Sequence, residues 1–254
     1  MDLRLDGRRA VVTGGSRGIG LAVAKALAAE GVRVALVARG EEALAAAAAE
    51  VPGAIAVAAD TGDDASVAAL ARAVGERLGG VDILVNAAAT PSSGRFEESE
   101  LEAEINVKVR GYLRTARAFA PGMTAAGWGR IINISGLAAR SAGSLVGSVR
   151  NVAVAALTKN LADELGPQGV NVVVVHPGLT RTEKTPQTLA AMAAARGVEP
   201  ADVERMAAAG VSIGRIVTAE EVAAVVAFLA SPLSVAINGD AIAVGGGAKG
   251  AIHY

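Results

Sequence analysis

The sequence predicts an α/β fold, with one doubly wound parallel sheet of about seven strands and helices on both faces. Short apolar runs rich in β-branched residues alternate with helical patterns along the chain. This alternation is typical of parallel strands joined by right-handed helical crossovers. The 254 residues suit one domain with a substantial core. No linker divides the chain, so we expect a single domain over residues 1–254.

The expected strands are short apolar segments, which suits strands buried on both faces. In order, they span Ala10–Thr13, Arg33–Ala38, Ala54–Ala59, Asp82–Asn86, Arg130–Ser135 and Val170–His176.

The expected helices lie between these strands and after them. They span about Ile19–Glu30, Glu41–Glu50, Asp63–Leu78, Leu101–Ala126, Asn151–Glu164 and Ala219–Leu229. The alanine run Ala43–Ala49 fits a surface helix, because alanine is the best helix former. Pro121 is expected to kink the long helix near its end. The segment 179–213 interrupts the alternation beyond a strand end, and we interpret it as a lid over the site.

Composition excludes several function classes. The net charge is −1 and no basic stripe is interleaved with aromatics, which argues against nucleic-acid binding. There is no cysteine, so neither disulfides nor a thiol nucleophile can contribute. Met1–Arg9 lacks the apolar run of a signal peptide, and no uninterrupted apolar stretch approaches membrane-spanning length. We therefore expect a cytoplasmic protein that binds no membrane and has no metal site.

A glycine-rich loop follows the first strand directly. It reads Thr13-Gly14-Gly15-Ser16-Arg17-Gly18-Ile19-Gly20 and opens the first helix. Glycines there allow a tight turn and let backbone amides approach a pyrophosphate at a helix N-terminus. A glycine pattern alone often marks an ordinary turn, but its place between a strand and a helix favours a dinucleotide site. We expect this site to be formed by Gly14, Ser16, Arg17, Gly18, Ile19 and Gly20.

From this loop onward, nearly the whole chain resembles the short-chain dehydrogenase/reductase (SDR) family. Further pieces in the family's order and spacing are Asp60 and Thr61, Asn86, Asn106, Pro177 with Gly178, and Thr182. The resemblance implies a Rossmann-like fold and oxidoreductase activity on a small molecule. It places Asp60 at the adenine ring and Thr182 at the nicotinamide amide.

Other features implied by the resemblance concern assembly and departures from the pattern. The helices 101–126 and 151–164 match the family's usual dimer faces, and the segment 241–247 resembles its last strand. These matches imply a homodimer or homotetramer. Ala89 and Gly245 stand where the family usually has glycine and aspartate, respectively.

Charge at the end of the second strand predicts the cofactor. NAD-selective proteins of this kind place an acidic residue there to bind the ribose diol. Here Ala38 holds that position, Arg39 follows, and Arg17 lies in the glycine loop. Two guanidinium groups would favour the 2′-phosphate of NADP over NAD through charge-assisted contacts. Alternatively, both arginines are simply solvated surface residues.

The sequence departs from the family at its active site, because tyrosine occurs only at 112 and 254. The family's Tyr-x-x-x-Lys pair aligns with Gly147 and Asn151, or with Val146 and Arg150 if the register shifts by one. Neither register contains a phenol. In the family the lysine lowers the tyrosine pKa and holds the ribose.

The remaining catalytic candidates are Asn106, Ser135, Arg150 and Asn151. Gly136 falls on the family's catalytic serine, but a shorter following loop would bring Ser135 into that role. Arg150 can bind an anion or stabilise an oxyanion, and Arg140 in the same loop can join it. The alternative is that these arginines are solvated or paired with acidic neighbours.

Other candidate groups near the cleft have plainer interpretations. The hydroxyls of Ser144 and Ser148 are poor unassisted acids. His176 is interpreted as structural, and Tyr112 as a core or interface residue. Tyr254 could reach a neighbouring subunit's cleft in a tetramer, although a frayed terminus is the simpler expectation.

Three functions are compatible with these features. The first is an NADP-dependent oxidoreductase with altered proton delivery. The second is an inactive, NADP-binding homologue that acts as a binding or regulatory subunit. The third is a lyase or isomerase that holds an anionic substrate. The retained cofactor motifs favour the first two, because a non-redox enzyme gains little from a nicotinamide site.

Overall fold

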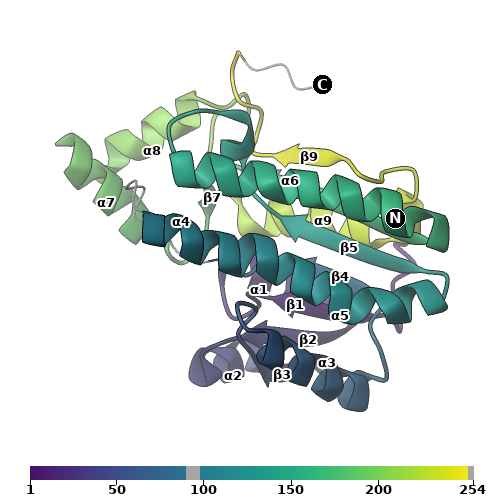
Figure 1. The fold of residues 1–254 in the computed structure, drawn as a ribbon. Helices are drawn as coiled ribbons and strands as arrows, with labels where there is room; N and C mark the ends of the chain where they lie inside the picture. Colours follow the sequence, from purple (N-terminus) through teal and green to yellow (C-terminus); the bar gives the residue numbers. More distant parts are fainter. Residues whose placement is uncertain (90–97, 251–254) are drawn as a thin grey trace.

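A seven-stranded parallel sheet forms the centre of the computed structural model, which describes residues 1–89 and 98–250 (Figure 1). The strand order is β3-β2-β1-β4-β5-β6-β9. The strands are β1 (Arg9–Thr13), β2 (Arg33–Ala38), β3 (Ile55–Ala58), β4 (Ile83–Asn86), β5 (Gly129–Ile134), β6 (Val170–Pro177) and β9 (Ala241–Val244). The predicted single-domain, Rossmann-like fold is therefore confirmed.

Helices cover both faces of the sheet. They are α1 (Gly18–Ala29), α2 (Glu41–Ala49), α3 (Asp64–Leu78), α4 (Glu98–Glu104), α5 (Gly111–Ala125), α6 (Leu145–Leu165), α7 (Thr185–Arg196), α8 (Pro200–Ala209) and α9 (Ala219–Ala230). Short 3₁₀ turns are η2 (Leu137–Arg140), η3 (Gly166–Gln168) and η4 (Pro232–Ser234), and two short strands, β7 (Thr180–Arg181) and β8 (Val217–Thr218), pair apart from the main sheet.

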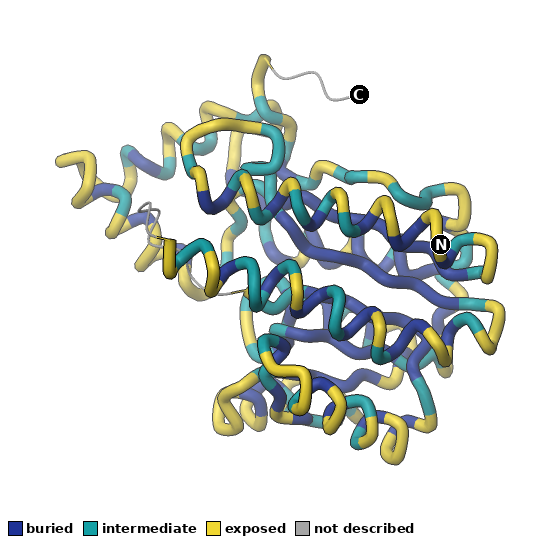
Figure 2. The backbone as a smooth tube through the Cα atoms, viewed as in Figure 1, coloured by how far each residue is buried: buried dark blue, intermediate teal, exposed yellow. Residues whose placement is uncertain are grey.

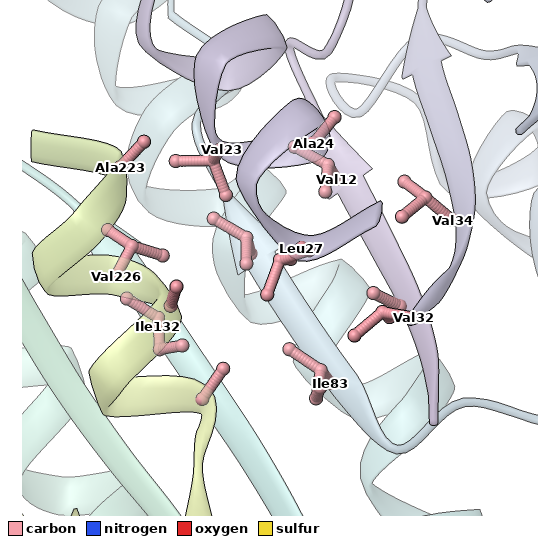
Figure 3. Close-up of a cluster of buried hydrophobic side chains, with 14 of the residues drawn as sticks. Val12, Val23, Ala24, Leu27, Val32, Val34, Ile83, Ile132, Ala223 and Val226 are labelled. Carbon is pink, nitrogen blue, oxygen red and sulfur yellow. The ribbon is translucent and has the colours of Figure 1, made fainter. Parts of the chain in front are cut away.

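Successive strand residues point to opposite faces of the sheet and enter two separate cores. Val12 packs with α1 and α9, whereas its neighbour Val11 packs with α3, α5 and α6. Figure 3 shows the first core, where Val23 and Leu27 of α1 lie close to Val226 of α9. Figure 2 shows the strands as the most buried part of the chain, as expected for a sheet covered on both sides.

The expected long helix Leu101–Ala126 differs from the observed structure. Its chain path is α4, then a π-helical turn η1 (Ile105–Arg110), then α5 with Pro121 inside it. A π-helical turn adds a residue to the helical repeat, a feature that sequence periodicity did not reveal. The turn resets which side chains face β5, so it bears directly on the site.

The helix expected at Asn151 begins earlier, at Leu145. Ser144 caps it, because its side chain accepts a hydrogen bond from Gly147 N. The segment 179–213 contains β7, α7 and α8, and the two helices share a small core of Leu189, Ala193 and Val203.

The strand order places a crevice at the carboxyl ends of the strands. The chain runs from β1 outward through β2 to β3, then returns to β4 on the other side of β1. Crossovers therefore leave β1 and β4 toward opposite faces, and ligands of such sheets bind at this switch point. Across the described residues, no helix is long and apolar enough to cross a membrane.

Candidate functional site

A cavity of about 510 Å³ opens at this switch point. Its wall is formed by the segments that follow or end β1, β2, β3, β4 and β5, by η1, and by the turn after β7. The predicted site residues that line it are Gly14, Ser16, Arg17, Gly18, Ile19, Gly20, Arg39, Asp60, Thr61, Ser135 and Thr182. Residues from seven separate stretches of the chain thus meet in one cavity of ligand size.

The glycine loop is tight enough to require glycine at two positions. Gly14 has φ +68°, and a Cβ there would lie 2.7 Å from the carbonyl oxygen of Ala87. A Cβ on Gly20 would lie 2.2 Å from the carbonyl oxygen of Gly14. Any side chain would push the loop away from β4 and from the start of α1, so the observed path depends on these glycines.

The first turn of α1 provides backbone N–H groups for an anion. Arg17 occupies its N-cap without a side-chain capping hydrogen bond, and the first turn carries no acidic residue. Gly18 N donates instead to Glu183 Oε2 at 3.2 Å, from the turn after β7. A carboxylate therefore already occupies the helix N-terminus, where a phosphate would also be stabilised.

The cavity end beside β2 is positively charged. Arg17 and Arg39 are both exposed and both line the cavity, and neither forms an ion pair with any other described residue. Asp60 lines the same end, where its Oδ1 accepts a hydrogen bond from Gly62 N at 2.8 Å. Thr61, only 5% exposed, lies beside it.

Asn86 lies behind the cavity wall in a buried polar network. Its Nδ2 donates to Asn133 Oδ1 at 3.0 Å, and its Oδ1 accepts from Thr115 Oγ1 at 2.7 Å. Asn133 Nδ2 in turn donates to Thr158 Oγ1 at 2.9 Å. The network joins β4 and β5 to α5 and α6, and so fixes the strand ends that carry the cavity.

Asn106, Pro177 and Gly178 also lie outside the set of lining residues. Asn106 belongs to η1, and its Nδ2 donates to Gly62 O at 3.1 Å, which ties the π-helical turn to the loop after β3. Pro177 ends β6 and Gly178 leads into β7, from which Thr182 reaches the cavity.

Ser135 lines the cavity at the end of β5, away from the two arginines. Its hydroxyl forms a hydrogen bond within the chain. Its Oγ donates to the backbone oxygen of Asn151 at 3.2 Å. Asn151 is 3% exposed, and its Oδ1 has no hydrogen-bond partner among the described residues. Gly147 is buried in the first turn of α6, and a Cβ there would lie 2.7 Å from Ser144 Oγ. A larger side chain at 147 would therefore require the capping hydroxyl of Ser144 to shift.

Arg150 is not directed at the cavity. It forms an ion pair with Glu104 of α4, a carboxylate that is 1% exposed. Burial lowers the pKa of the Arg150 guanidinium from its usual range, and Glu100 opposes this shift. The sequence left open pairing with an acidic neighbour as the alternative role of Arg150, and Glu104 is such a neighbour. The contact joins α4 to α6 at the start of η1.

Tyr112, His176 and Arg140, which were also candidates, form hydrogen bonds with the backbone of the fold. Tyr112 is 1% exposed, and its hydroxyl donates to Ile134 O at 2.9 Å. Burial raises the pKa of the Tyr112 phenol well above its ordinary value. His176 is buried and its Nδ1 accepts from Gly136 N at 3.3 Å. Arg140 donates to the backbone oxygen of Ala241 at 2.7 Å. Tyr254 lies outside the described residues.

Sequence reasoning missed Lys108, which lies on η1 and lines the cavity. It is 4% exposed, and its Nζ donates to the backbone oxygen of Ser135 at 3.1 Å. A signal was available: Lys108 stands four residues before buried Tyr112, on the helix face that continues inward to Ala116. Lysine is rare on a buried helix face, so this spacing distinguishes Lys108 from the surface lysines.

Within residues 1–89 and 98–250, no three His, Cys, Asp or Glu side chains cluster as they would around a metal ion. The cavity is lined by backbone amides, hydroxyls, the cations Arg17, Arg39, Lys108 and Lys184, and the carboxylates of Asp60 and Glu183. This set fits an anionic organic ligand with hydroxyl groups, such as a phosphorylated dinucleotide.

Comparisons with known proteins agree with the geometry. The family described as "Enoyl-(Acyl carrier protein) reductase" matches residues 14–249. The short-chain reductase protein NovJ of Streptomyces niveus is 38% identical over 247 residues, covering 94% of this chain and 92% of that protein.

Two solved structures with NADPH also match. The L-sorbose reductase of Gluconobacter frateurii, complexed with NADPH and L-sorbose, has a TM-score of 0.91 at 30% identity, covering 99% of this chain and 100% of that chain. A variant of the actinorhodin polyketide ketoreductase with NADPH has a TM-score of 0.88 at 32% identity, covering 94% and 96%. The chain therefore belongs to the short-chain dehydrogenase/reductase family of oxidoreductases.

Proposed function

We propose that the protein is an NADP(H)-dependent oxidoreductase that acts on a small molecule without the tyrosine and lysine usual at its family's active site. The observation that carries the cofactor assignment is the pair of exposed guanidinium groups, Arg17 and Arg39, at the cavity end beside β2. Ala38 stands where a carboxylate would repel a phosphate. The structures similar to this chain that contain NADPH support the same choice.

The bound cofactor would span the carboxyl edge of the sheet. Arg17 and Arg39 would hold the 2′-phosphate, the first turn of α1 the pyrophosphate, and Thr182 the nicotinamide amide. The glycine loop permits close approach, because its two crowded glycines keep β1, β4 and α1 together. The segment 179–213, which supplies Thr182 and Glu183 to the wall, would act as a lid.

When bound, the reduced cofactor supplies a hydride to an electrophilic carbon. In the described part of the chain, no phenol faces the cavity: position 147 is glycine, and the Tyr112 hydroxyl is buried against Ile134 O. A positioned acid is worth roughly two to four orders of magnitude in rate. Carbonyl reduction would therefore be slow, and activated double bonds would be affected less by the loss.

The assembly would be a homodimer or homotetramer built on α5 and α6. Leu145, Val149 and Val152 of α6 are 53%, 45% and 51% exposed, and their spacing places them on one helix face. A partner subunit would cover this apolar stripe, since it is unusual for a surface helix to expose one.

The cofactor assignment is tested by Arg39→Asp. NADPH and NADH are titrated by fluorescence into the wild type, into this variant, and into Arg72→Asp, which makes the same charge change on α3 outside the cavity. Loss of charge-assisted hydrogen bonds worth about 1.5–3 kcal/mol should weaken NADPH about tenfold to a hundredfold and NADH far less. Equal losses for both nucleotides would contradict the assignment.

Turnover is tested separately by following nicotinamide absorbance with L-sorbose, β-keto esters and activated alkenes. Consumption of NADPH with any of them supports the oxidoreductase. A second function, NADPH binding without turnover by a regulatory subunit, is favoured by one observation. A Cβ at position 147 would lie 2.7 Å from Ser144 Oγ, so a side chain there would require the Ser144 hydroxyl to move. Tight binding with no turnover across the panel would establish that function instead.

A further inference from the structure

Lys108 is a buried cation without a role in the proposed function. It lies on a π-helical turn, is 4% exposed, and reaches the cavity wall. Its Nζ donates to Ser135 O at 3.1 Å, the hydrogen bond seen for this ammonium within the described chain. An ammonium group carries three N–H donors, so it retains capacity for further acceptors.

No carboxylate of the described residues forms an ion pair with this ammonium. Lysine is almost never fully buried unless it is paired, because removing the charge from water is costly. A buried, uncompensated ammonium at a cavity wall is expected where a ligand supplies the missing acceptors.

The sheet order shows which part of a dinucleotide would meet Lys108. Strands β2, β1, β4 and β5 are neighbours in that order, so β2 and β5 are separated by three strand spacings, roughly 14 Å. Arg39 follows β2, the α1 N-terminus follows β1, and Ser135 with Lys108 lies at the end of β5. With the pyrophosphate at α1 and the phosphorylated ribose at Arg39, the second ribose falls at Lys108.

Within the described residues, α6 supplies no free cation beside Ser135, and none of its residues lines the cavity. Ser135 joins the two sides: its O accepts from Lys108, and its Oγ donates to the backbone oxygen of Asn151. Asn151 is neutral and buried, and its neighbour Arg150 is paired with Glu104. Beside Ser135, η1 therefore supplies a cation and α6 does not, while Lys184 reaches the cavity from the turn after β7.

We propose that Lys108 binds the hydroxyl groups of the nicotinamide-side ribose of NADP(H), since α6 offers only the neutral Asn151 and the paired Arg150 near Ser135. The inference rests on the proposed cofactor. Its geometric basis is the placement of the Nζ at the cavity wall beside Ser135, opposite the arginine end. Ribose hydroxyls provide oxygen acceptors for the remaining N–H groups.

The ionisation of Lys108 should make NADPH affinity depend on pH. Burial lowers the pKa of Lys108 from 10.5 to about 8, so the free protein loses this cation in mildly alkaline solution. The buried titratable groups on the elements packed against η1 are already engaged: Glu104 of α4 pairs with Arg150 of α6, and Tyr112 of α5 donates to Ile134 O. NADPH affinity should therefore fall above about pH 8.

The test compares two ligands of Lys108→Met, namely NADPH and adenosine 2′,5′-bisphosphate, which lacks the nicotinamide-side ribose. Binding is measured by fluorescence and calorimetry. We expect NADPH to weaken about tenfold, the loss of one charge-assisted hydrogen bond, while the bisphosphate binds as to the wild type. Lys159→Met is the matched control, since Lys159 is exposed and pairs with Asp163 on α6.

The pH dependence provides a second measurement on the unmodified protein. The ratio of NADPH affinity to bisphosphate affinity should fall from pH 7 to pH 9 in the wild type and stay constant in Lys108→Met. Unchanged NADPH binding by Lys108→Met, equal weakening of both ligands, or a pH-independent ratio in the wild type would overturn the inference. Failure of the wild type to bind either ligand would instead refute the proposed cofactor.

Discussion

Replacing Lys108 by methionine should stabilise the protein without ligand at neutral pH. Methionine has similar length and fills the same buried space without a charge. The fall of the Lys108 pKa from 10.5 to about 8 reflects the cost of burying the ammonium. Since each pKa unit corresponds to about 1.4 kcal/mol, this cost is about 3 kcal/mol below pH 8.

An opposing effect reduces the expected gain. Methionine cannot donate to Ser135 O, and a buried carbonyl without its partner costs about 1–2 kcal/mol. The net stabilisation of Lys108→Met should thus be about 1–2 kcal/mol, or an increase in melting temperature of a few degrees for a domain of this size. A residue that costs stability and improves ligand binding is typical of a functional site.

The sign of the pH dependence distinguishes this explanation from simple repacking. Because the folded-state pKa of Lys108 is lower than the unfolded one, the unfolded chain holds more protons between about pH 8 and 10.5. Wild-type stability should therefore gain a rising contribution over this window, and the advantage of Lys108→Met should shrink. Urea unfolding at pH 7 and pH 9.5 measures the difference, with Lys159→Met as control.

Two outcomes would refute the reasoning. If Lys108→Met were destabilised by 2 kcal/mol or more at pH 7, the ammonium would be held by favourable contacts that outweigh its desolvation. If the difference between variant and wild type were the same at both pH values, the ionisation of Lys108 would not be its source.

Three further changes probe the cavity and its supports. Glu183→Gln removes a carboxylate from the anion-binding Gly18 N–H, so NADPH should bind several-fold tighter by fluorescence titration; unchanged affinity would contradict this. Gly20→Ala places a methyl 2.2 Å from a backbone oxygen of the loop, so it should lower NADPH affinity at least tenfold, whereas Gly75→Ala, with no atom within 4 Å, should not. Glu104→Gln removes the buried carboxylate that pairs with the partly buried Arg150 and should cost about 3 kcal/mol in urea unfolding; a loss below 1 kcal/mol would show that the pair is dispensable.

Much of the cavity was predictable because its parts are local. The glycine loop, the ends of β2 and β6, and the turn bearing Thr182 follow short apolar strands, and parallel strands bring their carboxyl ends to one edge. The order of motifs along the chain therefore anticipated that Arg17, Arg39, Asp60 and Thr182 would share one cavity, as they do.

The part of the cavity beside Ser135 was harder to predict from the sequence. It depends on one π-helical turn and on contacts between distant segments. The turn at Ile105–Arg110 carries Lys108 to Ser135, which lies 27 residues along the chain. Arg150 was a candidate for the reaction, and only packing between α4 and α6 revealed Glu104 as its partner.

By itself, the sequence determined the alternation of strands and helices, the glycine loop and the absence of tyrosine between positions 112 and 254. Those properties depend on residue type and near neighbours along the chain. Only the tertiary structure decided which charges are buried, which are paired and which reach the cavity. Lys108 and Arg150 are both basic residues in helical segments, yet one lines the cavity and the other meets a carboxylate. Burial and distance across the fold separate them, and these arise only when the helices pack on the sheet.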